Sequence, residues 1–149
     1  MEPRLNPYAA SPALMKQYLD LSEAVAGSGL EHSLIELVKI RGSQINGCAN
    51  CLNMHTSDAR KAGETEQRLH LLAAWHEAPV FSDRERAALA WVDHLTLIAD
   101  KRAPDGVYAD LDAHFSKEEQ VKLTMMIVVI NGWNRIAVGF NLYDAKLGW

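Results

Sequence analysis

The sequence predicts an all-α protein, a single-domain helical bundle with about six or seven helices. Apolar residues recur at spacings of three, four and seven along most of the chain, which is the period of an amphipathic helix. Capping residues precede several of these stretches, and glycine or proline follows them, as at the ends of helices. Alternating β-branched runs bounded by turns, which mark strands, are absent.

The first three predicted helices have defined starts or stops. Ser11 is an N-cap candidate before Pro12 at the first helical position, and this helix ends in the Gly-Ser-Gly of residues 27–29. The second begins near residue 30 and stops at residues 46–47, because Asn and Gly tolerate the left-handed conformation. The third runs from about residue 48 to 63. The first helix would carry four apolar residues on one side: Leu14, Tyr18, Leu21 and Val25. The second would carry an apolar stripe: Leu30, Leu34, Leu37, Val38 and Ile45.

Four more helices are predicted in the second half of the chain. One covers roughly residues 66–76. Ser82 and Glu85 match a capping box and open the next helix, whose inner face would carry Ala88, Trp91, Leu95 and Ile98. A shorter helix spans about residues 104–114. Ser116 and Glu119 match a second capping box before a helix, residues 121–142, that is apolar on most sides. Such a helix must be covered on most sides, either at the centre of the fold or at a subunit interface.

Composition indicates one ordinary folded domain over residues 1–149. The chain has a mass of 16.6 kDa, with 48% hydrophobic and 23% charged residues, and is long enough to bury a core without staples. The net charge is −4, and the chain lacks the basic stripe that nucleic-acid binding needs. No apolar run approaches the ~20 residues of a membrane-spanning helix, and the first residues do not match a signal peptide. We expect a soluble, cytoplasmic protein that binds neither nucleic acid nor membrane.

Four residues predict a reactive site. Cys48 and Cys51 lie three residues apart, and in a reducing cytosol such a pair indicates redox or metal chemistry rather than a static disulfide. His55 follows Cys51 by four residues, so their side chains share one helix face. The start of a helix and a neighbouring imidazole both lower the pKa of a thiol. Glu36 would return to the level of the cysteines if the turn at residues 46–47 folds the two helices antiparallel, and its carboxylate would then orient or protonate His55.

Other interpretations of these residues stay open. The two cysteines would be inert buried thiols, or they would bind zinc with His55 and Glu36 as further ligands. Glu36 would be a solvated or salt-bridged helix residue, and His55 a surface or capped histidine. The remaining histidines have no partner pattern and are expected to be structural: His32, His70, His76, His94 and His114.

The segment from Glu36 to His55 resembles the core motif of the alkylhydroperoxidase D-like group of the carboxymuconolactone decarboxylase family. That motif is Glu, eleven residues, Cys-x-x-Cys, three residues, His, and the chain matches it in residue types and spacing. The clear resemblance covers roughly residues 20–100, and the Asn-Gly-Trp-Asn-Arg of residues 131–135 is similar to the closing helix of many members. The resemblance implies the alkylhydroperoxidase D-like fold and a thiol-dependent, peroxiredoxin-like antioxidant peroxidase that uses no metal or organic cofactor.

The resemblance also implies roles. Cys51 would attack the hydroperoxide and become a sulfenic acid, and Cys48 would condense with it to a redox-active disulfide. An external dithiol reductant, a protein or a small molecule, would reopen that bond. Glu36 and His55 match the family's proton-relay positions. Asn50 departs from the best-studied peroxidase members, which have a histidine between the cysteines, and an amide cannot carry a proton in the relay.

Two other functions stay open: a thiol–disulfide relay or redox sensor, and a decarboxylase-like member without peroxidase activity, although the lactone-decarboxylating branch typically lacks the cysteine pair. The resemblance further implies a homo-oligomer, a trimer or hexamer, in keeping with the apolar last helix. Asn134 and Arg135 lie in that otherwise apolar helix. Because a buried guanidinium must be paired, a structural or intersubunit ion pair is expected there rather than a substrate clamp. The tryptophans are expected to fill the core or an interface: Trp75, Trp91, Trp133 and Trp149.

Overall fold

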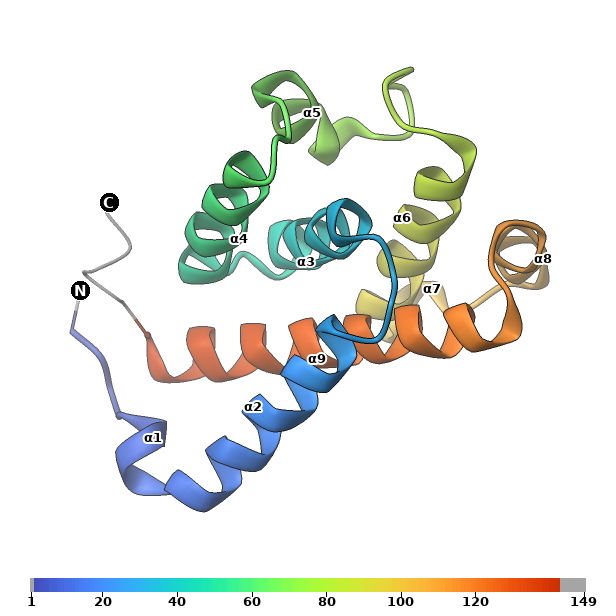
Figure 1. The fold of residues 1–149 in the computed structure, drawn as a ribbon. Coiled ribbons are helices and arrows are strands. Elements are labelled where there is room, and N and C mark those ends of the chain that lie inside the picture. The colour runs from blue at the N-terminus through green and yellow to red at the C-terminus, as the bar shows by residue number, and fades with distance from the viewer. Residues whose placement is uncertain (1, 143–149) are drawn as a thin grey trace.

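Figure 1 shows a computed structural model in which helices pack around one long helix, α9. The structure describes residues 2–142, and these form nine α-helices and one 3-10 helix without a strand. The α-helices are α1 (Pro7–Ala10), α2 (Pro12–Ala26), α3 (His32–Asn46), α4 (Ala49–Lys61), α5 (Glu66–Leu71), α6 (Asp83–Thr96), α7 (Ile98–Lys101), α8 (Asp105–His114) and α9 (Lys117–Phe140). The all-helical prediction is confirmed. The count of six or seven was too low, because the four-residue helices α1 and α7 are too short to show a period.

Helix α9 is central, one of the two positions that its apolar sequence allowed. It packs against α2, α3, α4, α6 and α8. Its inward residues Leu123, Met126 and Ile127 join the main hydrophobic cluster. By length and composition alone α9 is apolar enough to cross a membrane, and within the described fold its inner side belongs to the core.

Local end signals are well reproduced. Both capping boxes are present. The Ser82 and Ser116 hydroxyls accept from the backbone N–H groups of Glu85 and Glu119, and the side chains of these glutamates accept from the backbone N–H groups of the serines. Helix α3 ends at Asn46, and Gly47 has the left-handed φ of 65° that glycine adopts without strain. Helix α5 ends at Leu71 and tightens into the 3-10 helix Leu72–Ala74, so the predicted helix to residue 76 was too long.

The side of a helix that is buried was predicted less well. Helix α2 buries Met15 and Val25, whereas Leu14 and Leu21 are 63% and 38% exposed. Ile98 is not on the inner face of α6, because α6 ends two residues earlier and Ile98 is 53% exposed at the start of α7. Sequence spacing groups residues on one helix side, but the neighbours decide which side is covered.

A close contact fixes α2 across α9. The Tyr18 hydroxyl donates to the Val129 carbonyl at 2.7 Å, and the Trp133 indole N–H donates to the Ser22 hydroxyl at 2.8 Å. An ideal Cβ at Gly132 would lie 1.9 Å from the Tyr18 oxygen, so the tip of the Tyr18 ring fits here only over a residue without a side chain.

Polar side chains join the end of α3 to α9. The Asn46 amide donates to the side-chain oxygens of Asn131 and Asn134 at 3.0 and 2.9 Å, and the Asn134 amide donates to the Ser43 hydroxyl at 2.9 Å. The expected structural ion pair at Arg135 is not present within residues 2–142, because this guanidinium is exposed and donates to Asn131. The network fixes the turn from which α4 begins.

The tryptophans have two kinds of surroundings. Trp75 and Trp91 are buried in the two main hydrophobic clusters, as expected. Trp133 is only half-buried and faces a pocket as well as the core. Trp149 lies outside the described residues.

Candidate active site

The cysteine pair lies at the start of α4. Cys48 is the N-cap residue with extended backbone, and its sulfur accepts the N–H of Cys51 at 3.3 Å. The two cysteines are joined by a disulfide with a Cα–Cα separation of 5.4 Å, within the range that such a bond requires. Both are buried, with 1% and 3% exposure. Their sulfurs therefore meet in the first helical turn, where the helix dipole favours a thiolate once the bond is reduced.

Packing of α3 against α4 brings Glu36 to His55. The His55 Nδ1 atom lies 3.0 Å from Glu36 Oε2, and the two residues are 8% and 4% exposed. With the carboxylate ionised, Nδ1 donates its proton to it, which leaves Nε2 as the basic nitrogen. Glu36 thus fixes the tautomer and the direction of an imidazole that stands one helical turn from Cys51.

Lys39 holds the other oxygen of the same carboxylate. Its ammonium donates to Glu36 Oε1 at 2.9 Å and is 17% exposed. Burial by itself raises the pKa of the Glu36 carboxyl, but the hydrogen bond and charge of His55 and the charge of Lys39 outweigh it, so the pKa lies below its usual value. The carboxylate is therefore ionised at neutral pH.

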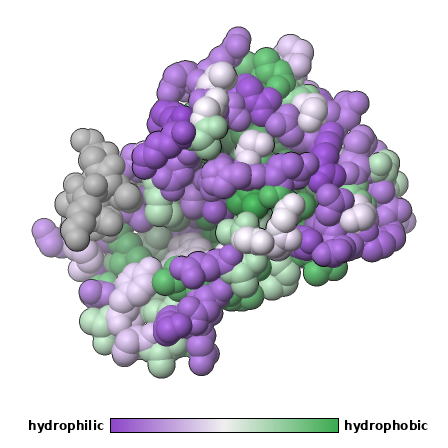
Figure 2. Space-filling view, viewed as in Figure 1, coloured by the Kyte–Doolittle hydropathy of each residue, from purple (hydrophilic) through white to green (hydrophobic). Residues whose placement is uncertain are grey.

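A large pocket opens beside this arrangement. Its volume is about 680 Å³, and both Cys51 and His55 line it, whereas Cys48 does not. Its other walls come from residues 3–8, from α2 and from the α9 face that includes Met126, Ile130 and Trp133. Figure 2 shows a hollow on this face between α1 and α4, with apolar residues at its edges. Cys51 is consequently the sulfur that a small molecule in this pocket meets.

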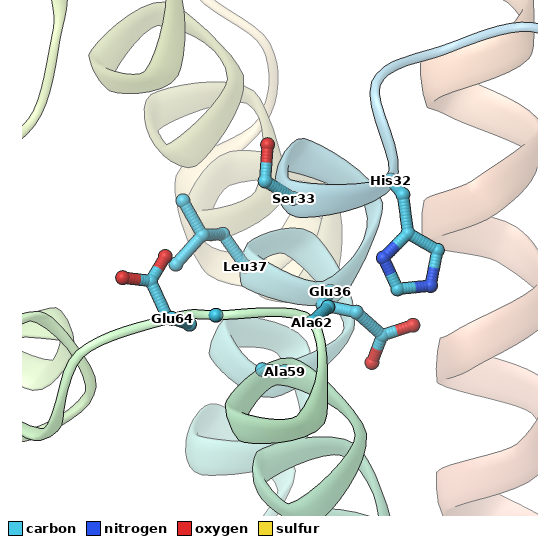
Figure 3. Close-up of a pocket in the computed structure, with 8 residues that line it drawn as sticks. His32, Ser33, Glu36, Leu37, Ala59, Ala62 and Glu64 are labelled. Carbon is cyan, nitrogen blue, oxygen red and sulfur yellow. The ribbon is translucent and has the colours of Figure 1, made fainter.

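A second, smaller cavity of about 120 Å³ lies on another side of Glu36. It is lined by His32 and Glu64 among others, and neither cysteine contributes to it. Figure 3 shows His32 and Glu36, four residues apart on α3, projecting to the same side, and Glu64 pointing elsewhere. Glu36 therefore also borders a cavity that neither cysteine lines.

The structure thus brings the four residues singled out in the sequence to one region, where they form two separate pairs of direct contacts. Glu36 contacts His55 and Lys39, while Cys51 is bonded to Cys48. Within residues 2–142 no three His, Cys, Asp or Glu side chains are arranged to hold a metal ion, and the two cysteines that the zinc interpretation uses as ligands are joined in a disulfide. Glu36 is salt-bridged, as the alternative supposed, to Lys39, and the same carboxylate also contacts the candidate base His55.

Sequence reasoning missed Lys39 and the pocket walls. Lys39 follows Glu36 by three residues, and this spacing is a signal for an ion pair on one helix side. The contribution of residues 3–8 has no such signal, because they lie about thirty residues before Glu36, where the motif begins.

Comparisons with known proteins cover most of the chain. The carboxymuconolactone decarboxylase family matches residues 12–94. The uncharacterized protein YdfG of Bacillus subtilis (strain 168) is 46% identical over 138 residues, which is 93% of this chain and 94% of that protein.

Solved structures share the fold. The crystal structure of ATU0492 from Agrobacterium tumefaciens, a protein of unknown function and a candidate antioxidant defence protein AhpD, has a TM-score of 0.93 and 48% identity, over 96% of this chain and 98% of that chain. The debrominase Bmp8, in complex with 2,3,4-tribromopyrrole, has a TM-score of 0.83 at 15% identity, over 93% of this chain and 75% of that chain. At that identity it shares the fold alone.

Proposed function

The chain belongs to the carboxymuconolactone decarboxylase family with an AhpD-like fold, and on that premise we propose that it is a cysteine-based hydroperoxide reductase. Cys51 is the attacking residue, Cys48 the resolving residue, and His55 with Glu36 the proton relay. The description of the Agrobacterium protein as a candidate for antioxidant defence supports the same role here.

The reaction balances with two thiols and one hydroperoxide. His55 takes the proton of the Cys51 thiol, and the resulting thiolate attacks the terminal peroxide oxygen, so that an S–O bond forms as the O–O bond breaks. The leaving alkoxide then takes that proton back from His55 and departs as the alcohol. The Cys48 sulfur then displaces hydroxide from the sulfenic acid, and that hydroxide leaves as water after taking the second thiol proton. The products are an alcohol, water and a disulfide, which an external dithiol reduces by thiol–disulfide exchange.

One observation carries this proposal. Cys51 and His55 line the same pocket from one helix, while Glu36 holds the imidazole from behind and Cys48 lies within bonding distance of Cys51. A nucleophile, a base, a group that orients the base and a resolving thiol are therefore present around a space that admits substrate.

Thiol counting after one equivalent of cumene hydroperoxide tests the proposal on the reduced protein. Wild type is expected to lose two thiols, the Cys48→Ser variant to lose one and form a sulfenic acid that dimedone traps, and the Cys51→Ser variant to lose none. Loss of the Cys48 thiol in Cys51→Ser, at the rate at which Cys48→Ser loses its Cys51 thiol, would exclude Cys51 as the attacking residue.

The alternative functions give other outcomes. A thiol–disulfide relay reacts slowly with hydroperoxide but exchanges fast with a dithiol protein. A member without peroxidase activity keeps both thiols with every hydroperoxide tried. Multi-turnover assays with several dithiols, both protein and small-molecule, separate these results from a peroxidase cycle.

We also propose that α9 contacts a second copy of the chain. Its outer side leaves Val121, Val128 and Val138 exposed at 63%, 51% and 51%. Light scattering is expected to show an oligomer, a trimer or hexamer, that the Val128→Asp variant weakens. A monomer at micromolar concentration contradicts this proposal.

A further inference from the structure

The pocket at Cys51 has one wall that the family match does not include. Pro3, Leu5, Pro7 and Tyr8 all line this pocket, whereas the match to the family begins at residue 12. We call residues 2–8 the N-terminal wall. The contacts that this wall makes with the pocket therefore come from outside the segment that matches the family.

The N-terminal wall is fastened to the far end of α9. The Arg4 backbone N–H donates to the Phe140 carbonyl at 2.9 Å, and its guanidinium donates to the Gly139 carbonyl at 3.0 Å. The Asn141 amide donates to the Glu2 carbonyl at 2.9 Å. Three hydrogen bonds across a separation of more than 130 residues hold the wall in place along the pocket.

Aromatic rings connect the wall to α9. The Tyr8 ring stacks on Trp133 with centroids 6.5 Å apart and planes at 21°, and both residues line the pocket. The Trp133 N–H is already bonded to Ser22, so the ring offers the pocket an apolar surface. Leu5 is 42% exposed and lines the same space.

We propose that Leu5 and Tyr8 of the N-terminal wall, together with Trp133, set the substrate selectivity of the site. The pocket takes neutral organic hydroperoxides with a bulky apolar body, branched or aromatic, in preference to hydrogen peroxide. The inference rests on the proposed function, since Cys51 is the residue that meets the peroxide.

The charges around the pocket support a neutral substrate. Among the described lining residues the lysine is Lys39, and its ammonium is bonded to Glu36. A carboxylate, Glu23, also lines the pocket. An anionic substrate would thus face a neutralised cation and a like charge, which disfavours it.

The size and apolar surface of the pocket support a bulky substrate. An organic hydroperoxide loses apolar surface to the walls when its peroxide group reaches Cys51, and this burial favours binding. Hydrogen peroxide has no apolar surface to bury. Removing wall side chains is therefore expected to slow the organic substrate and to leave hydrogen peroxide unchanged.

The test compares two hydroperoxides on reduced protein. The rate constant for loss of the Cys51 thiol is measured with cumene hydroperoxide and with hydrogen peroxide, for wild type and for the double variant Leu5→Ala/Tyr8→Ala. The cumene hydroperoxide rate is expected to fall about tenfold or more, and the hydrogen peroxide rate to change less than about twofold. Leu14→Ala is the matched control, because Leu14 is an exposed leucine, at 63%, that does not line the pocket.

A second pair of variants releases the wall without removing apolar groups. Arg4→Ala removes the bond to Gly139, and Asn141→Gly removes the bond to Glu2 while glycine keeps the left-handed backbone at φ 55°. Both are expected to lower the cumene hydroperoxide rate selectively. Equal losses with both peroxides, or no loss beyond that of Leu14→Ala, would overturn the inference.

Binding of the product alcohol separates this inference from the proposed function. Calorimetry with 2-phenylpropan-2-ol on the oxidised protein needs no turnover. Suppose that the wild type reacts with no hydroperoxide but binds the alcohol, and that the Leu5→Ala/Tyr8→Ala variant does not bind it. This result keeps the pocket assignment and refutes the peroxidase function. Peroxidase activity with alcohol binding unchanged in that variant refutes the pocket assignment alone.

Discussion

Replacing Glu36 by glutamine removes one negative charge and almost no volume. In the wild type that charge accepts from His55 at 3.0 Å and from Lys39 at 2.9 Å, on a residue that is 4% exposed. A glutamine oxygen accepts from one of these partners, and its amide group repels the other. The imidazole then loses the carboxylate that fixes its tautomer.

The expected loss has two parts. Positioned acid–base groups contribute about 10²–10⁴ in rate, and since His55 itself is retained we expect the lower end, a fall of about 100-fold in Cys51 oxidation. That factor corresponds to about 2.7 kcal/mol of activation free energy. A hydrogen bond to a charged group stabilises by about 1.5–3 kcal/mol, so losing one of the two lowers the free energy of unfolding by about 2 kcal/mol.

The assay follows the rate of thiol loss with cumene hydroperoxide from pH 5 to 9, together with urea unfolding. Glu64→Gln is the matched control, because Glu64 is ion-paired with Arg68 at 2.9 Å and its side chain is 10% exposed, yet it does not line the large pocket. Its peroxide rate is expected to stay within about twofold of wild type. A Glu36→Gln rate within threefold of wild type at every pH would refute the assigned relay.

Three other perturbations have defined outcomes. Lys39→Met is expected to slow the peroxide reaction about tenfold and Lys39→Arg to restore it, because a cation keeps its partner carboxylate ionised; rates against pH for both variants check this. Gly132→Ala is expected to lower the free energy of unfolding by about 3 kcal/mol, since its Cβ would meet the Tyr18 oxygen at 1.9 Å; a urea midpoint equal to that of wild type contradicts it. Glu119→Gln tests a carboxyl whose pKa the Arg84 hydrogen bond lowers to about 2. Because the pKa of this carboxyl is lower in the folded state, the stabilisation that Glu119 contributes is present above pH 4.5 and is lost as the pH falls toward 2. Thermal unfolding should therefore show the variant less stable than wild type at pH 7, by about 1 kcal/mol for this partly exposed pair. The two proteins should become equally stable near pH 2.

Spacing within one helix predicted the part of the site that lies on α4. Cys48, Cys51 and His55 follow one another at three and four residues, and backbone geometry alone places such residues together. Both capping boxes and the stop at Gly47 were predictable for the same reason, because the hydrogen bonds that define them join residues a few positions apart.

Contacts between helices were not predictable at this level. A periodic pattern indicates that a helix has an apolar side but not which neighbour covers it. The predicted side of α2 therefore grouped Leu14 and Leu21, which the fold leaves exposed, with Val25, which it buries. The same limit applies to Arg135, whose position in an apolar helix indicated burial, although α9 turns it to solvent.

The amino-acid sequence by itself determined the helical class, the two capping boxes, the stop at Gly47 and the cysteine–histidine grouping, since each depends on local backbone geometry. Tertiary structure decided that the Glu36 carboxylate is shared by His55 and Lys39, and that residues 2–8 wall the space in front of Cys51. Those outcomes depend on how α3 packs on α4 and how the N-terminal wall meets the end of α9. Chain segments so far apart meet only because the whole core brings them together, and no short stretch of sequence encodes that.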